Sequence, residues 1–237
     1  MPTQKPADLY EALLASLKAK ADADRAAHEK GYQKSNWEHW GVALPEMDAA
    51  IRETLGGADE TALIKLAERL WRQPVWDLKI VAGRIIALSA VSPSERLWAF
   101  VRARLGDLDG WAVADNLAPA ASRCLVADPK RLDEVETWVE SPHLWTRRAA
   151  LVFTLPWARG NRNPERMLGW VSRLLGDKEW FIQKAIGWWL RELSKRAPDR
   201  VRRFLDAHGE AVRGVARREA TKYLTAPAKP RRARAKT

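Results

Sequence analysis

The sequence predicts an all-α fold, an α-solenoid in which antiparallel helix pairs stack on one another. Similar segments start at Trp76, Trp111, Trp145, Trp180 and Val215, so the starts are 35, 34, 35 and 35 residues apart. Pro and Gly residues separate these segments, and no alternating strand pattern of useful length occurs. Two helical segments in each period of about 35 residues are typical of a solenoid.

The part that precedes the repeats is also expected to be helical. Residues 6–36 carry a stripe of leucines from Leu9 to Leu17, followed by an alanine- and charge-rich segment. The aromatic-rich residues 32–41 are expected to form a shaped loop or a helix end. A short helix is expected over 46–55, before two glycines.

Each repeat is expected to hold two helices. First helices are predicted at about 60–71, 94–105, 130–140, 164–175 and 199–208, and second helices begin at the five recurring positions. On a helical wheel the second helices have an apolar face and a face rich in aromatic and cationic residues. The second face is expected to line a concave basic groove. Small residues on this face, such as Gly83 and Gly187, would let another surface come close.

Composition narrows the function classes. Lys and Arg outnumber Asp and Glu by 41 to 30, which favours nucleic acid or an anionic membrane as the partner. The N-terminus has no apolar run, so neither a signal peptide nor a membrane span is indicated. The single cysteine, Cys124, fits a reducing cytoplasm, and no zinc-binding or nucleotide-loop motif occurs. We expect one domain over 1–225 and a basic tail over 226–237.

A row of cations recurs in the second helices. Lys or Arg occupies the third to fifth place after the start of the helix in four of the five repeats. Interleaved with indoles, this row favours a track for DNA phosphates over a merely solvated helix face. The leading candidates for phosphate contacts are Lys79, Arg148, Lys184 and Arg218.

The repeat that starts at Trp111 carries Asp115 instead of a cation. Four residues apart in a helix, this indole and this carboxylate share one face. Pro119 removes the amide that would bond the Asp115 carbonyl, so a kink is expected beside the carboxylate. Two plainer interpretations of Asp115 stay open: an ion pair with a nearby Arg, or a hydrogen bond at a helix end. Trp188 also projects from the predicted groove side, whereas Trp98, Trp138, Trp170 and Trp189 are expected to pack between repeats.

Several segments resemble the AlkD-type DNA glycosylases of the DNA alkylation repair superfamily, which are built from HEAT-like helical repeats. These segments are Phe181–Trp188, Trp145–Leu151 and Trp111–Asp115. Tyr32 and Lys34, in a tyrosine-glutamine-lysine turn, are similar to the N-terminal DNA contact of that family. The resemblance extends from about residue 10 to residue 224, and residues 36–41 depart from it.

The resemblance implies excision of N3- and N7-alkylated purines from duplex DNA, which leaves an abasic site. Carried over to this chain, Asp115 would be the catalytic carboxylate, Trp111 and Trp188 the aromatic walls at the lesion, and Arg148 a backbone contact. No metal or cofactor is implied. The expected protein is a monomer in the cytoplasm, on the nucleoid when bound to DNA. Two other classes stay open: a non-catalytic solenoid that binds duplex or unusual DNA structures, and a protein-binding scaffold.

Overall fold

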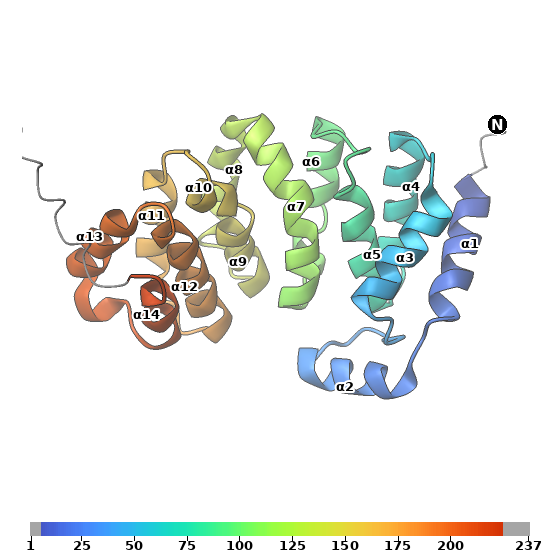
Figure 1. Cartoon of the computed structure of the whole chain (residues 1–237), viewed down its shortest axis with the longest axis horizontal. Helices are drawn as coiled ribbons and strands as arrows, with labels where there is room; N and C mark the ends of the chain where they lie inside the picture. The colour runs from blue at the N-terminus through green and yellow to red at the C-terminus, as the bar shows by residue number, and fades with distance from the viewer. Residues whose placement is uncertain (1–5, 225–237) are drawn as a thin grey trace, which may run out of the picture. The chain divides into compact units, whose positions relative to one another are not determined.

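The structure, a computed structural model, describes residues 6–224, so the predicted basic tail over 226–237 lies outside the described residues. The contacts divide the chain between Phe153 and Thr154 into two compact units. Across the described residues the regular structure is helical, apart from one isolated bridge between Glu38 and Val75. The all-α prediction is confirmed (Figure 1).

The first unit contains the N-terminal helices and the first three repeats (Figure 1). Its helices are α1 (Pro6–Lys18), α2 (Ala23–Gln33), α3 (Leu44–Leu55), α4 (Glu60–Trp71), α5 (Trp76–Ile86), α6 (Glu95–Arg102), η1 (Leu105–Asp107), α7 (Trp111–Ala127), η2 (Pro129–Arg131), α8 (Leu132–Trp138) and α9 (Leu144–Val152). The helical stretch expected over 6–36 consists of two helices, and Asp22 caps the second by accepting a hydrogen bond from the Arg25 amide.

The second unit contains the last two repeats and a short preceding helix. Its helices are α10 (Leu155–Arg159), α11 (Glu165–Leu174), α12 (Trp180–Ser194), α13 (Pro198–His208), η3 (Gly209–Ala211) and α14 (Gly214–Thr221). In both units the recurring segment marks the start of a second helix, at its first residue in α5, α7 and α12 and at its second in α9 and α14. The predicted repeat register is confirmed.

Neighbouring repeats are joined by hydrogen bonds between residues about one period apart. The indole of Trp71 donates to Asp107 at 2.9 Å, and the indole of Trp98 donates to Glu134 at 3.0 Å. In the second unit the Arg200 guanidinium pairs with the carboxylate of Glu165, 35 residues earlier. Within each unit the repeats therefore stack in a constant register, as a solenoid requires.

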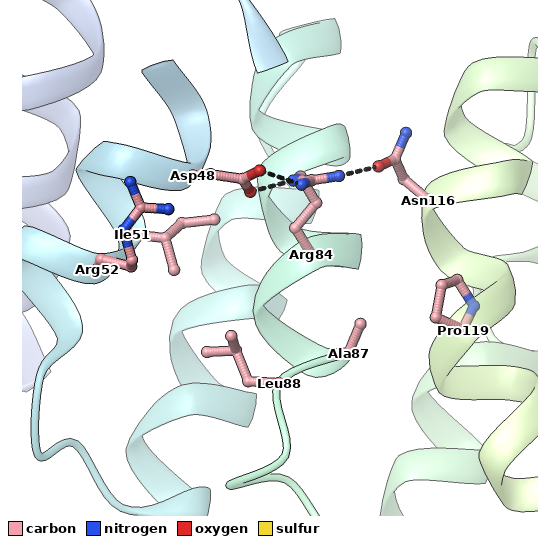
Figure 2. Close-up of a pocket in the computed structure, with 8 residues that line it drawn as sticks. All are labelled: Asp48, Ile51, Arg52, Arg84, Ala87, Leu88, Asn116 and Pro119. Atoms are coloured by element: carbon pink, nitrogen blue, oxygen red, sulfur yellow. Dashed lines mark hydrogen bonds and ion pairs between the residues drawn. The ribbon is translucent and has the colours of Figure 1, made fainter. Parts of the chain in front are cut away.

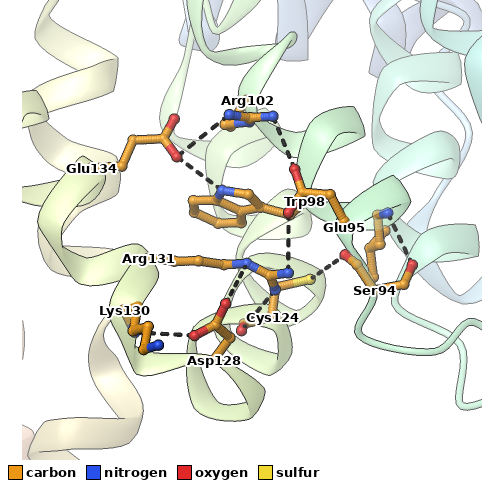
Figure 3. Close-up of polar contacts among 10 residues, drawn as sticks. Ser94, Glu95, Trp98, Arg102, Cys124, Asp128, Lys130, Arg131 and Glu134 are labelled. Atoms are coloured by element: carbon orange, nitrogen blue, oxygen red, sulfur yellow. Dashed lines mark hydrogen bonds and ion pairs between the residues drawn. The ribbon is translucent and has the colours of Figure 1, made fainter.

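Arg131 shows how such contacts fix the buried parts of the repeats (Figure 3). Its guanidinium donates to the Cys124 carbonyl at 3.1 Å and to the Glu95 carboxylate at 3.3 Å. The same guanidinium lies 5.7 Å from the centre of the Trp98 ring. Burial raises the pKa of the Cys124 thiol to about 11. The thiol is therefore protonated at neutral pH and is a poor nucleophile.

The small residues of the second helices admit a neighbouring helix. A Cβ atom added to Gly83 would lie 2.9 Å from the Asn116 carbonyl oxygen of α7, and one added to Gly187 would lie 2.7 Å from the Glu219 Cβ of α14. The surface that comes close at these two positions is thus the next repeat. Within residues 6–224, none of the helices combines the length and the apolar character of a membrane span.

Candidate functional site

The candidate catalytic side chains of the first unit lie on α7. Trp111 opens this helix and is half-buried, and Asp115 follows one turn later with 24% of its side chain exposed. Pro119 lies inside α7, which continues beyond it to Ala127. An indole and a carboxylate are thus presented side by side on a helix whose hydrogen-bond ladder lacks one amide directly after them.

Arg148 of α9 holds the Asp115 carboxylate. Its Nη1 donates to Oδ1 at 2.5 Å and its Nη2 to Oδ2 at 3.2 Å, while only 5% of the arginine side chain is exposed. A forked pair of this kind fixes the plane of the carboxylate. The prediction that Arg148 contacts the DNA backbone is therefore corrected, because its guanidinium is buried against Asp115. Of the two plainer interpretations of Asp115, the structure shows the ion pair with an arginine.

The end of α2 reaches the start of α7. The Tyr32 ring lies edge-on to Trp111, with ring centroids 6.5 Å apart, and Ser35 Oγ donates to the Asp109 carboxylate at 2.7 Å. Tyr32 is 67% exposed, and the exposed Lys34 ends α2 with a φ of 53°. The structure thus brings Tyr32, one of the two predicted N-terminal contact residues, next to Trp111, a juxtaposition that sequence spacing alone does not show.

Lys79 is not a surface cation, so its prediction as a phosphate contact is wrong. The side chain is buried, and its Nζ donates to the Trp71 carbonyl at 2.8 Å and lies 4.1 Å from the centre of the Trp37 ring. Burial lowers the pKa of this amine, and Asp107 and Asp109 oppose that effect. A buried ammonium group bonded to a carbonyl cannot reach a DNA phosphate.

The segment over residues 35–42 explains this burial, because it covers the start of α5. Asp77, fully buried, accepts hydrogen bonds from the amides of Trp40 and Val42, both at 2.8 Å. The His39 ring stacks on the indole of Trp76, with centroids 4.8 Å apart. Trp76, the first residue of α5, is therefore buried as well.

In the second unit, two predicted phosphate contacts are exposed. Lys184 of α12 and Arg218 of α14 both lie on the surface of this unit. Trp188 is half-buried, and the Arg159 guanidinium lies 5.9 Å from the centre of its ring, whereas Trp189 is fully buried as expected. The place of Trp188 at a lesion stays a prediction.

A pocket of about 410 Å³ opens between α3, α5 and α7 of the first unit (Figure 2). Arg84 crosses it, pairs with the Asp48 carboxylate through Nε at 2.6 Å, and donates through Nη1 to Asn116 Oδ1 at 2.9 Å. The Asn116 amide in turn donates to the Ala112 carbonyl. The hydrogen bonds among these polar groups link α3, α5 and α7. The link to α7 is made by Asn116, the residue directly after Asp115.

The fold is similar to that of solved structures with low sequence identity. One, described as "Predicted DNA alkylation repair enzyme" from Enterococcus faecalis, has a TM-score of 0.72, 22% identity, and coverage of 86% of this chain and 97% of that chain. AlkD2 from Streptococcus mutans has a TM-score of 0.59 and 22% identity, over 78% of this chain and 91% of that chain. The protein smu.31 from Streptococcus mutans has a TM-score of 0.59 and 22% identity, over 89% of this chain and 100% of that chain.

At the level of sequence, no curated protein matches the chain significantly. A family model described as "DNA alkylation repair enzyme" matches residues 13–224, which include α7, the Asp115–Arg148 pair and the cationic positions of α12 and α14. This match covers most of the chain. The solved structures named above have a fold similar to that of this chain. The chain therefore belongs to the DNA alkylation repair enzyme family.

Proposed function

We propose that this protein is a monofunctional DNA glycosylase that hydrolyses the N-glycosidic bond of N3- and N7-alkylated purines in duplex DNA. It acts as a monomer, without metal or cofactor, and leaves an abasic site. The observation that carries the proposal is the carboxylate of Asp115, held by Arg148 and set one turn from the half-buried indole of Trp111. Membership of an alkylation repair family supports the choice of substrate.

The chemistry needs little from the protein beyond electrostatics. Alkylation of a purine ring nitrogen makes the base cationic and therefore a good leaving group. When the bond between C1′ and N9 breaks, its electron pair stays with the purine, and positive charge develops on the deoxyribose. A fixed carboxylate stabilises that charge and orients the water that attacks C1′. The water's proton passes to the carboxylate or to bulk solvent.

Arg148 is a positioning residue in this scheme. It binds one lone pair on each Asp115 oxygen, and each oxygen retains further acceptor capacity on its exposed side. The aromatic face of Trp111, one turn before Asp115, stabilises a cationic base by cation–π attraction. Tyr32, Lys34, Lys184 and Arg218 are exposed and available to contact the DNA.

The test is release of free base from methylated duplex DNA, measured by chromatography. Wild-type protein should release 7-methylguanine and 3-methyladenine, whereas Asp115→Asn should bind the same duplex with similar affinity and release neither. Chelators should leave the rate unchanged. Absence of release by wild-type protein, or full release by Asp115→Asn, contradicts the proposal.

One observation favours a second function. Both Asp115 oxygens are engaged by a buried guanidinium, an arrangement that is also typical of a purely structural ion pair. The protein would then be a non-catalytic binder of duplex or unusual DNA structures. In that case the DNA affinity of wild-type protein should fall steeply with salt while no base is released. A failure to bind duplex DNA at low salt would favour a protein-binding scaffold instead.

A further inference from the structure

A second pocket, of about 440 Å³, lies wholly within the second unit and outside the site described above. It is formed by the loop that precedes α12, the first turn of α12 and the start of α14. Its wall includes Lys178, Trp180, Gln183, Arg213 and Gly214. The volume is in the range of small-ligand sites, about 300–1,000 Å³.

The pocket wall is held in place by Gln183. Its amide donates to the carbonyls of Leu174, Leu175 and Asp177, at 3.4, 3.2 and 2.8 Å. One side chain of α12 thereby fixes the loop that carries Lys178. The Asp177 carboxylate, which also belongs to the wall, accepts a hydrogen bond from the Glu179 amide at 2.8 Å.

One aromatic and two cationic side chains of the pocket wall are exposed. Trp180 is 51% exposed, and the Lys184 ammonium group lies 4.8 Å from the centre of its ring. Lys178 and Arg213 are also exposed. Gly214 lines the same pocket, and a Cβ added to it would meet no atom within 4 Å, so the wall is open at this residue.

We propose that this pocket binds an unpaired nucleotide of DNA, with its base stacked on Trp180 and its phosphate between Lys178 and Arg213. Exposed indoles with nearby cations are stacking platforms for single-stranded nucleic acid, and every base offers a π face. A base inside a duplex is stacked on both faces and cannot present one to the indole. The ligand is therefore a terminal or extruded nucleotide. The proposal rests on the DNA-binding part of the proposed function and not on base excision.

The experiment compares two unmodified duplexes of identical sequence, one blunt and one with a three-thymidine overhang, made with either strand polarity. Stacking of one base on an aromatic side chain stabilises binding by about 1–3 kcal/mol, or roughly 5- to 150-fold in affinity. Wild-type protein should prefer an overhang by at least about 5-fold. Trp180→Ala should lose this preference, Trp180→Phe should keep most of it, and Lys178→Gln with Arg213→Gln should weaken it and reduce its salt dependence.

Tyr223 provides the matched control. It is 48% exposed, and the Lys195 and Lys222 ammonium groups lie 5.4 and 5.8 Å from the centre of its ring, but it does not line the pocket. Tyr223→Ala should retain the overhang preference. The proposal is overturned if wild-type protein binds both duplexes equally, if Trp180→Ala keeps the preference, or if Tyr223→Ala loses it equally.

Base release from a blunt methylated duplex, measured in parallel, separates the two proposals. Release without an overhang preference contradicts only the nucleotide pocket. An overhang preference without release contradicts only the glycosylase.

Discussion

The second helices α5 and α12 start at equivalent places in the repeat but have opposite environments. Trp76, the first residue of α5, is 6% exposed, whereas Trp180, the first residue of α12, has half of its surface exposed. One turn later Lys79 is buried beneath Trp37, and Lys184 lies on the surface against the indole of Trp180. The first turn thus carries a structural cation in α5, three residues after the Trp, and an available cation in α12, four residues after the Trp.

The difference comes from what covers each helix. Residues 35–42 lie on the start of α5 and are bonded to it through Asp77, while the start of α12 borders an open pocket. The repeat period therefore determines where a helix begins, but contacts from elsewhere in the unit determine which of its faces meets solvent.

The largest effect is expected at Gly41, whose φ is +72°. An added Cβ atom would lie 2.2 Å from the Asp22 carbonyl oxygen and 2.5 Å from the Ala26 amide nitrogen. Gly41→Ala should lower the free energy of unfolding by about 3–5 kcal/mol, measured by urea denaturation, because strain and overlap add. Gly57 is the control: its φ is +82° and its surroundings are open, so Gly57→Ala should cost about 1 kcal/mol. Equal losses would mean that the segment does not pack closely on α2.

A smaller loss is expected when the bond between the segment and α5 is removed. Asp77→Ala leaves the amides of Trp40 and Val42 without their acceptor, and should lower the free energy of unfolding by about 2–4 kcal/mol. Asp59→Ala, which removes an exposed helix cap, should cost about 1 kcal/mol in the same urea titration. A loss at Asp77 no larger than at Asp59 would contradict the covering role.

The two lysines should differ in DNA binding. Lys184→Gln should reduce the slope of log affinity against log salt by about 0.9, as expected for one lost phosphate contact. Lys79→Met should leave affinity and slope unchanged, because the buried amine bonds a backbone carbonyl. Fluorescence anisotropy with a blunt duplex at several salt concentrations measures both. Equal slopes for the two variants would remove the distinction between α5 and α12.

The smallest effect is a pH dependence from His39. Burial lowers its pKa below the ordinary 6.5, while Asp77 and Asp109 oppose the shift and Lys30 adds to it. Between the lowered pKa and 6.5 the unfolded chain binds more protons than the folded one, so stability should rise with pH across this window. His39→Phe, which keeps a ring on Trp76, should flatten that rise in urea midpoints taken at pH 5.5 and 7.5. An unchanged slope would contradict the assignment.

Much of the fold followed from the sequence because helix starts are local signals. The recurring positions and the Pro and Gly breakers predicted the first residue of each second helix to within one residue. The burial of Lys79 did not follow, since a helical wheel treats its polar face as open and the cover comes from about forty residues earlier. The pairing of Asp115 with Arg148 carried a usable signal: the residues are 33 apart, close to the period that joins neighbouring repeats. The sequence left that pairing as one of several alternatives.

The central claim is that the Asp115 carboxylate acts in catalysis and does not merely link two helices. Asp48 allows a matched comparison, because it forms the same kind of forked pair with Arg84 in the same unit. The most direct test is the single-turnover rate of 7-methylguanine release by Asp115→Asn and Asp48→Asn. We predict a loss of about 100-fold or more for Asp115→Asn and a change within about 2-fold for Asp48→Asn. Equal rates for the two variants would contradict the account.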